Sequence, residues 1–235
     1  MLIFCEVCMK KLFVYFSKME IILWSVSVIF IILSFSIFDR ESYLTLIASL
    51  IGVTSLIFNA KGNPIGQALM IAFSLIYGII SYAFSYYGEM ITYLGMTMPM
   101  ALFALISWLK NPYQGNKAEV KVNNIGKSEQ LFMWLLTLIV TVVFYFILDY
   151  FNTANIVPST ISVTTSFLAV YLTFRRCPTF ALAYAANDIV LIVLWGLASL
   201  TDIRYISVVV CFVAFLFNDI YGYISWQRMK RRQSK

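Results

Sequence analysis

The sequence contains no histidine and few charged residues. Asp, Glu, Lys and Arg together make up 12% of the 235 residues, compared with about 25% in a typical soluble domain. Without histidine, the chain can have neither a histidine general base nor a proton relay built on imidazole. With so little charge and 61% hydrophobic residues, it does not have the composition of a soluble domain. We therefore interpret it as an all-α, polytopic membrane protein.

Cysteine is also scarce, and its pattern does not indicate a metal site. Cys5 and Cys8 have the CxxC spacing of a zinc site. A structural zinc site needs four ligands, and neither a second CxxC motif nor a histidine is present to complete it. Cys177 and Cys211 stand apart from each other and from this pair. We expect the protein to use no metal and no cofactor.

Long apolar runs dominate the chain. Each is close to the length of about 20 residues that a helix needs to cross a bilayer. The runs are continuous, which excludes the alternating pattern of a membrane β-barrel. Charged residues, glycine and proline fill the breaks, as in Lys61-Gly62-Asn63-Pro64. The eight predicted transmembrane helices are 21–38, 43–60, 64–87, 90–109, 131–148, 156–174, 178–200 and 205–227.

The basic residues predict the orientation of these helices. With the segment 1–20 placed in the cytoplasm, 15 of the 17 Lys and Arg residues fall on the cytoplasmic side, and only Arg40 and Arg204 fall outside. This agrees with the positive-inside rule. Both termini, including the basic tail 228–235, are then cytoplasmic. The net charge of +6 follows from this topology and indicates no nucleic-acid partner.

Most of the tryptophans fall at predicted helix ends. Aromatic residues at such positions are typical interfacial anchors beside lipid headgroups. Only Trp195 is expected to lie deeper. The four tryptophans interpreted as cytoplasmic anchors are Trp24, Trp108, Trp134 and Trp226.

The segment 110–128 divides the chain into two similar halves. Its asparagines and glycines are typical of an exposed cytoplasmic connector. The sequence Ile-Ser-Trp-Leu-Lys that ends the first half corresponds to Ile-Ser-Trp-Gln-Arg in the second, and Pro64 corresponds to Pro178. We interpret 43–109 and 156–227 as two three-helix bundles. Because one linking helix, 129–150, lies between them, the bundles are parallel repeats, and 21–38 is an extra N-terminal helix.

Two Asn-Asp pairs lie inside predicted transmembrane helices. Asp188 is ten residues after Pro178, about 15 Å along a helix, and Asp219 is nine residues before Arg228, about 13 Å from the same membrane face. The pairs Asn187-Asp188 and Asn218-Asp219 are therefore expected at one depth near the midplane. Ionisable residues at such depth are candidates for a functional site. The alternative is that they tie helices together by hydrogen bonds.

An indole adds to this candidate site. Asp188 and Trp195 are spaced i, i+7 and share a helix face, so a carboxylate and an aromatic ring lie on one wall. Such a wall suits a flat, polar, cationic ligand. In the first bundle Gln67, with Asn59 and Asn63, is expected either to cap helices or to form an inner gate. No acid is expected to be buried there.

Three stretches of the chain resemble the PnuC family of nicotinamide riboside transporters. They are Asn-Ala-Lys-Gly-Asn-Pro-Ile-Gly-Gln at 59–67, the segment 176–195 with Asn-Asp-Ile-Val-Leu-Ile-Val-Leu-Trp at its end, and Phe-Asn-Asp-Ile-Tyr-Gly at 217–222. The resemblance covers about residues 20–228 and implies a fold similar to the SWEET sugar transporters. Asn187, Trp195 and Asn218 match family positions that line the substrate cavity. Gln67 and Tyr221 are further candidates within these stretches.

The resemblance also implies how such a protein works. It implies facilitated diffusion of nicotinamide riboside across a bacterial cytoplasmic (inner) membrane, with trapping by an intracellular kinase, by a homotrimer embedded in the lipid bilayer. Related members carry thiamine or other vitamins, and Ile192 and Ala198 stand where some members have a second tryptophan, so another vitamin is an alternative substrate.

Other classes of function stay open on the residues alone. A membrane enzyme is disfavoured because the chain lacks histidine and its acids stand beside asparagines on different helices. An ATP-driven importer would need a partner, since the chain has no GxxxxGK[ST] motif. An ion-coupled carrier could use Asp188 or Asp219 as a proton site.

Overall fold

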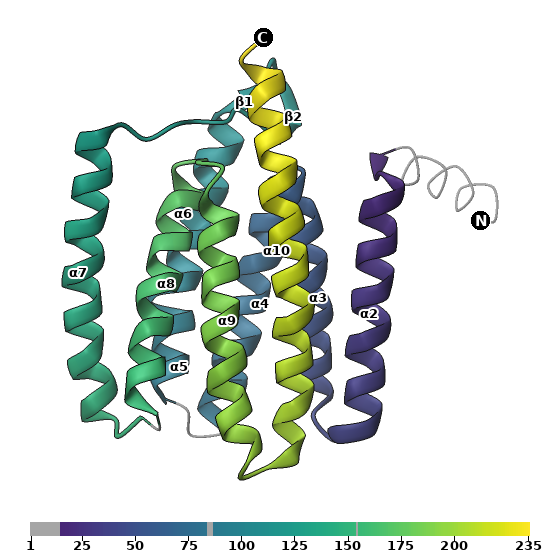
Figure 1. Ribbon diagram of the computed structural model, residues 1–235, viewed down its shortest axis with the longest axis vertical. Coiled ribbons are helices and arrows are strands. Elements are labelled where there is room, and N and C mark those ends of the chain that lie inside the picture. The colour runs from purple at the N-terminus through teal and green to yellow at the C-terminus, as the bar shows by residue number, and fades with distance from the viewer. Residues whose placement is uncertain (1–14, 84–86, 154) are drawn as a thin grey trace.

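The computed structural model is an upright bundle of helices that run in alternating directions (Figure 1). It describes residues 15–83, 87–153 and 155–235. Eight segments of this part of the chain are long and apolar enough to cross a membrane, as the sequence predicted. The elements are α2 (Lys18–Phe38), α3 (Tyr43–Ala60), α4 (Ile65–Ala83), α5 (Tyr87–Ile91), the π-helical turn η1 (Thr92–Thr97), α6 (Met98–Lys110), β1 (Pro112–Tyr113), β2 (Asn116–Val120), α7 (Lys127–Tyr150), α8 (Ile156–Phe174), α9 (Phe180–Ser199), the 3-10 turn η2 (Ile203–Tyr205) and α10 (Ile206–Gln233).

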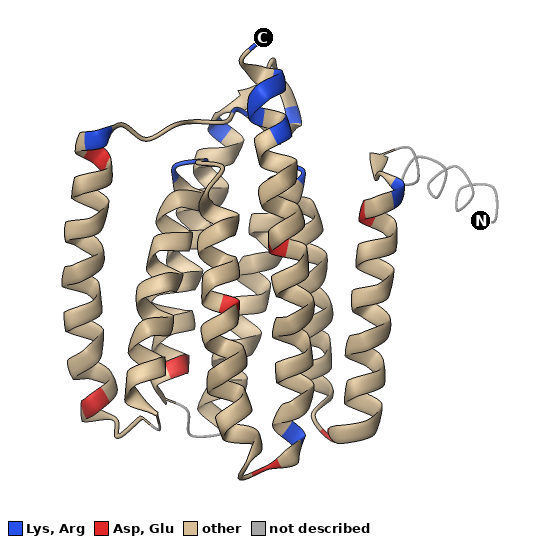
Figure 2. Ribbon diagram, in the orientation of Figure 1, with Lys and Arg blue, Asp and Glu red and all other residues tan. Residues whose placement is uncertain are grey.

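The two ends of the bundle differ in charge. Figure 2 shows that most Lys and Arg residues gather at the end that holds the β-hairpin and the C-terminus. We call this the basic end. The turn between α2 and α3 and the turn between α9 and α10 lie at the other end, which we call the opposite end. Helix α2 begins at the basic end, so the described chain starts and finishes on one side.

Helices α9 and α10, which carry the two Asn-Asp pairs, pack against each other and against several neighbours. Helix α9 packs against α8 and α10, and α10 packs also against α2 and α3. Helix α7 lies at one edge of the bundle, with α8 as its main neighbour (Figure 1). Much of its remaining surface is apolar and exposed, which suits contact with lipid.

The first helices of the two bundles, α3 and α8, end in the same turn. Gly62 and Arg176 each have a left-handed backbone, with φ of 65° and 56°, and each is followed two residues later by a proline. The next residue in each turn donates its N–H back into the helix, from Asn63 to Phe58 at 3.0 Å and from Cys177 to Leu172 at 2.9 Å. This equivalence supports the repeat that the sequence predicted.

The connector 110–128 is mostly exposed, as expected, but it also contains a hairpin and a buried residue that the sequence analysis did not predict. Strands β1 and β2 form an antiparallel hairpin, and the side chain of Val120 is fully buried. The Val120 N–H donates to the carbonyl of Gly62 at 2.9 Å, and the Asn123 N–H donates to the carbonyl of Arg176 at 3.0 Å. The connector therefore binds the equivalent turns of both bundles, because its backbone groups find partners there.

Two of the predicted interfacial tryptophans are core residues instead. Trp108 and Trp226 have 0% exposure and pack with Phe180. By contrast, Trp24 and Trp134 are 39% and 56% exposed, as expected for anchors. All four tryptophans lie near the ends of transmembrane helices. The helix face on which each lies decides whether its indole contacts lipid or protein.

Candidate functional site

The two buried aspartates meet between α9 and α10. Asp188 and Asp219 are 4% and 5% exposed, and their side chains lie close enough to share a hydrogen bond, although Asp188 Oδ2 has no partner among the described residues. Two carboxyl groups share a hydrogen bond only when one of them carries a proton, and a pair bonded in this way has one negative charge. Among the described residues, no Lys or Arg forms an ion pair with either. A cationic ligand would supply the missing partner.

Asn187 points away from this pair, toward α8. Its Oδ1 accepts hydrogen bonds from Thr165 at 2.8 Å, Ser166 at 3.0 Å and Ser162 at 3.3 Å. Adjacent residues on a helix are turned by about 100°, so Asp188 can face α10 while Asn187 faces α8. The hydroxyl groups of α8 thus hold Asn187 in place.

Asn218 points to the other side, toward α2. Its Nδ2 donates to Ser27 at 2.9 Å and to the carbonyl of Ala214 at 2.7 Å. Its Oδ1 has no hydrogen-bond partner among the described residues, although the side chain is 1% exposed. The two asparagines therefore flank the aspartate pair on opposite sides and tie α9 and α10 to their neighbours.

Trp195 lies about 10 Å along α9 from Asp188, toward the opposite end. It is 6% exposed, and its ring lies 5.3 Å from Tyr205 and 6.3 Å from Tyr77, measured between centroids. Two small cavities, of about 20 and 140 Å³, border it. The indole is therefore close to the opposite end of the bundle and has open space beside it.

A cluster of aromatic side chains from the first bundle, which the sequence did not predict as part of the site, lies beside Trp195. Tyr77 of α4 lies 4.5 Å from Tyr93 of η1, and Phe73 lies 5.8 Å from Phe215 of α10, between ring centroids. These rings pack in one buried cluster with Trp195. The i, i+4 spacing of Phe73 and Tyr77 was the available signal, but such a pair is also typical of an ordinary apolar core.

Gln67 and Tyr221 bind partners near the basic end. The Gln67 Nε2 donates to Asn59 Oδ1 at 2.8 Å and so ties α4 to α3. The Tyr221 hydroxyl donates to Glu20 Oε1 on α2 at 3.1 Å. The structure thus brings Asp188 and Asp219 together and turns Asn187 and Asn218 toward α8 and α2. Trp195 lies about 10 Å along α9 from the pair, and Gln67 and Tyr221 are directed elsewhere.

Comparison with known proteins identifies the family. The model of the nicotinamide mononucleotide transporter family matches residues 42–228. The chain belongs to this family. It is 25% identical, over 202 residues, to the nicotinamide riboside transporter PnuC of Neisseria mucosa, which covers 84% of this chain and 77% of the relative. The crystal structure of the vitamin B3 transporter PnuC superimposes with a TM-score of 0.80 and 22% identity, over 93% of this chain and 94% of that one.

This match confirms the resemblance drawn from the sequence, and the shared fold confirms the predicted fold class. The chain is therefore a multi-pass protein of a membrane transporter family. In a transporter, both ends of the bundle matter because a solute must enter at one and leave at the other.

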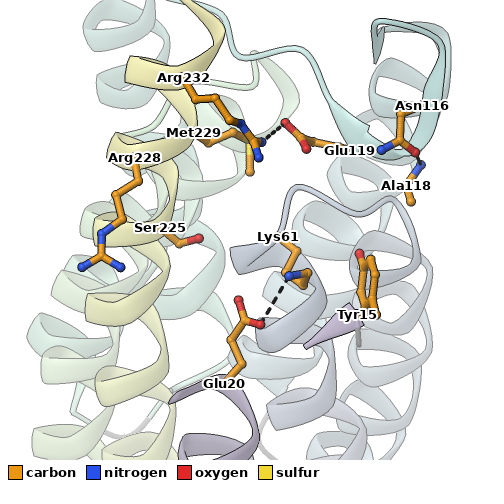
Figure 3. A pocket seen from close by; sticks show the side chains of 10 residues that line it. All are labelled: Tyr15, Glu20, Lys61, Asn116, Ala118, Glu119, Ser225, Arg228, Met229 and Arg232. Atoms are coloured by element: carbon orange, nitrogen blue, oxygen red, sulfur yellow. Dashed lines mark hydrogen bonds and ion pairs between the residues drawn. The ribbon is translucent and has the colours of Figure 1, made fainter. Parts of the chain in front are cut away.

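At the basic end a cavity of about 620 Å³ opens between the start of α2, the hairpin and the last turns of α10 (Figure 3). Its volume is in the range of ligand pockets, about 300–1,000 Å³. Lys61 Nζ lies 3.3 Å from Glu20 Oε2 and 4.6 Å from the centre of the Tyr15 ring. Arg232 pairs with Glu119 across the cavity. This transporter thus has a roomy, charged opening at its basic end.

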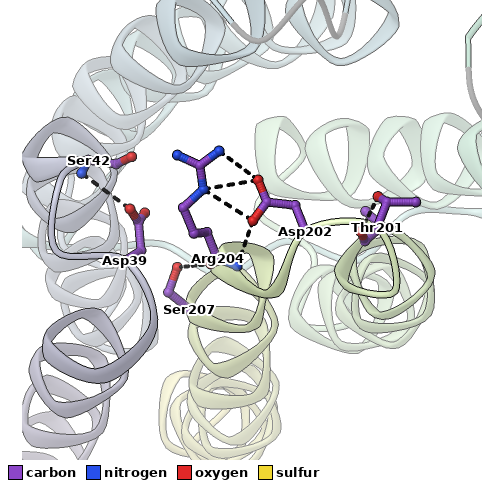
Figure 4. A network of polar contacts seen from close by, with 7 residues as sticks. Asp39, Ser42, Thr201, Asp202, Arg204 and Ser207 are labelled. Carbon is purple, nitrogen blue, oxygen red and sulfur yellow. Dashed lines mark hydrogen bonds and ion pairs between the residues drawn. The ribbon is translucent and has the colours of Figure 1, made fainter.

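At the opposite end a polar network fills the corresponding position (Figure 4). Arg204 binds Asp202 through its side chain at 2.7 Å, and the Ser42 N–H donates to Asp39 Oδ1 at 3.2 Å. The hydrogen bonds from Arg204 lower the pKa of Asp202 below its usual value. The cavity that these residues share with Trp195 is about 20 Å³, enough for a water molecule but too small for a ring.

The first bundle contains a buried acid after all. Glu89, which the sequence analysis placed in a break between helices, lies in the first turn of α5 and is 7% exposed. It borders the 140 Å³ cavity beside Trp195. The break begins earlier than predicted, because α4 ends at Ala83, and Glu89 is therefore drawn into the next transmembrane helix.

Proposed function

We propose that this protein takes up nicotinamide riboside across the bacterial cytoplasmic membrane by facilitated diffusion. The buried Asp188–Asp219 pair at the α9–α10 contact carries the proposal, in a fold shared with a vitamin B3 transporter. The Neisseria mucosa relative is a nicotinamide riboside transporter by name. An intracellular kinase then traps the transported riboside and draws uptake forward. By family resemblance, the transporter is a homotrimer.

The chemistry of the riboside fits the residues around the pair. Its hydroxyl groups can donate to carboxyl oxygens of Asp188 and Asp219, and its pyridinium ring has a permanent positive charge. The face of Trp195 attracts such a ring with about 0.5–2 kcal/mol. One ligand with hydroxyls at one end and a cationic ring at the other can reach both groups. Asn218 Oδ1, which lacks a partner among the described residues, is a further acceptor close to the pair.

The sequence supports passive transport over transport driven by ATP within this chain. The chain has no nucleotide-binding GxxxxGK[ST] motif, so it has no ATP site of this kind to drive accumulation. In the proposed orientation the basic end and both termini face the cytoplasm, in agreement with the positive-inside rule. The open cavity at the basic end and the narrow opposite end then describe an inward-facing arrangement.

Transport by the purified protein in liposomes tests this function. We expect labelled nicotinamide riboside to enter until its internal concentration equals the external one, without ATP and without a partner protein. Accumulation above that level under a pH gradient would instead indicate ion coupling through Asp188 and Asp219. If thiamine stabilises the protein in a thermal-shift assay and nicotinamide riboside does not, the substrate is a different cationic vitamin.

Substitution of Trp195 tests the position of the site. Loss of a cation–π contact of about 0.5–2 kcal/mol should weaken binding of nicotinamide riboside to Trp195→Ala by about 2- to 30-fold in calorimetry. Trp134→Ala, which removes an exposed indole on α7, is the matched control and should bind as the parent does. Equal binding by Trp195→Ala, Trp134→Ala and the parent would place the site elsewhere.

A further inference from the structure

Glu89 and Trp195 border the same cavity at the opposite end of the bundle. The cavity has a volume of about 140 Å³ and lies between the first turn of α5, the start of α8 and the last turns of α9. Thr153 and Ser159 contribute hydroxyl groups to its lining, and Leu197 contributes an apolar side. It therefore combines an acid, an indole and small polar groups in one space.

The Glu89 carboxyl has no partner among the residues that the structure describes. It is 7% exposed, and the structure gives it no hydrogen bond or ion pair with any described residue. The Thr153 hydroxyl oxygen beside the cavity is also buried without a hydrogen bond among these residues. Burial of a carboxylate without a partner is unfavourable. A cation in the cavity would relieve this cost, whereas an anion would increase it.

The size of the cavity limits what can enter. Pockets for complete small molecules usually measure about 300–1,000 Å³, so 140 Å³ suits a single ring and excludes an entire nucleoside. Trp195 offers an aromatic face, which binds a flat cation better than a flat neutral ring. These two properties select a cationic aromatic ring as the occupant.

The charge around this end favours the same kind of ligand. Five acids lie at the opposite end, against two basic residues there, Arg40 and Arg204. A surface with an excess of one sign concentrates ligands of the other sign before they bind. The five acids are Asp39, Glu41, Glu89, Asp149 and Asp202.

We propose that this cavity is the ring subsite of the transport site, which holds the cationic ring of the vitamin near the opposite end, with Glu89 as counter-ion and Trp195 as stacking partner. The subsite rests on the proposed function, because it assumes that the transported solute contains such a ring. It adds a residue from the first bundle to the recognition of charge, in addition to the aspartate pair of the second bundle.

A purely structural role of Glu89 would have a different signature. An acid in the first turn of a helix interacts favourably with the helix dipole, and Glu89 is in the first turn of α5. If this were its only role, its replacement would lower stability and would affect charged and uncharged ligands alike. The comparison of two ligands of similar size, one with a charged ring and one with an uncharged ring, therefore separates the two roles.

The experiment measures binding by calorimetry to the full-length Glu89→Gln protein. The two probes are nicotinamide riboside and its reduced form, whose dihydropyridine ring is uncharged. We expect the affinity for nicotinamide riboside to fall about 10-fold or more, while the affinity for the reduced form changes less than about 2-fold. Asp149→Asn, an exposed acid at the same end, is the control and should change neither.

Equal losses for both probes, or no loss for either, would overturn the subsite. If Glu89→Gln does not fold, Glu89→Asp gives the same test, because it keeps the charge and shortens the reach. It should then retain the preference for the charged probe, and loss of that preference would contradict the proposal. If the parent protein binds no nicotinamide riboside, the proposed function fails. If the parent binds it and Glu89→Gln binds both probes equally well, only the subsite fails.

Discussion

Trp108 and Trp226 meet at the centre of the basic end, with ring centroids 5.4 Å apart. Each is in the last helix of one bundle and donates its Nε1–H to the first helix of the other bundle. The acceptors are the carbonyls of Thr173, at 2.9 Å, and Asn59, at 2.7 Å. Both acceptors stand five residues before the proline that opens the next helix. The two halves of the transporter thus hold each other by the same contact used twice.

Replacement of either indole should destabilise the protein. Each acceptor carbonyl also accepts a hydrogen bond from the following turn, from Gly62 or Arg176, so Trp108→Phe or Trp226→Phe removes one bond without leaving the carbonyl unpaired. We expect a loss of about 0.5–1.5 kcal/mol for the bond, with an added loss from the smaller ring in a closely packed site. Thermal unfolding in detergent measures it.

Trp134→Phe is the matched control, because that indole is 56% exposed and should be almost neutral. An equal shift in melting temperature for Trp134→Phe and Trp226→Phe would contradict the structural role of the central pair.

Gly62 should be intolerant of a side chain. Its φ of 65° is a left-handed conformation that costs other residues about 1–2 kcal/mol. A Cβ there would lie 3.1 Å from the Met229 side chain and 3.2 Å from Val120. Gly62→Ala is therefore expected to lower the free energy of unfolding by at least about 1 kcal/mol.

The control for this substitution is Gly126→Ala, measured in the same denaturation experiment. Gly126 has a φ of −75° and no neighbour within 4 Å of an added Cβ. Because Gly126 is the N-cap residue of α7, where glycine is preferred to alanine, the control should lose only about 0.5 kcal/mol. If Gly62→Ala were equally harmless, the connector would not be anchored on this turn as described.

The sequence predicted the transmembrane helices well because hydropathy and length determine them. It also predicted that Asp188 and Asp219 lie at one depth, since helix rise is constant. Rotation about the helix axis is the part that hydropathy leaves undetermined. Trp108 and Trp226 were mistaken for interfacial anchors for this reason.

The polar residues show the same limit of sequence reasoning. Asn187 and Asn218 turned out to face α8 and α2, although each precedes an aspartate that faces the α9–α10 contact. Glu89 was missed because a charge beside a predicted break is indistinguishable from a loop residue. The buried Val120 was missed because five residues of a hairpin inside an Asn- and Gly-rich segment have too little apolar pattern.

Cysteine labelling tests the orientation in the membrane. Cys177 and Cys211 are buried, so neither reports on its side, and Cys5 and Cys8 lie outside the described residues. The test therefore uses single cysteines introduced into a variant from which the native cysteines have been removed. Thr201→Cys, at the opposite end, should react with an impermeant maleimide in intact cells. Lys117→Cys, in the hairpin, should react only after lysis.

Both positions are exposed in the structure, so access to the reagent is not limited by the fold. The opposite pattern of labelling would mean that the basic end faces outward. It would contradict the positive-inside assignment and with it the inward-facing interpretation of the 620 Å³ cavity.

Substitutions in the Asp188–Asp219 pair should affect ligand binding unequally. Either single substitution should have a small effect, whereas the double substitution should have a large one. A carboxamide can replace the protonated member of the pair, because it also donates a hydrogen bond to a carboxylate. Asp188→Asn or Asp219→Asn should therefore keep one hydrogen bond and one negative charge. Each single variant is expected to bind nicotinamide riboside within about 3-fold of the parent, which corresponds to less than about 0.7 kcal/mol.

The double variant removes the charge while it keeps the shape and the hydrogen bond between the two side chains. Hydrogen bonds to a charged group contribute about 1.5–3 kcal/mol, so the loss should weaken binding by about 10- to 150-fold. Calorimetry on the three variants measures this, and their melting temperatures show whether each is folded. If a folded double variant bound the cation as well as the single variants do, the negative charge would not contribute to recognition. The pair would then serve only to hold α9 against α10.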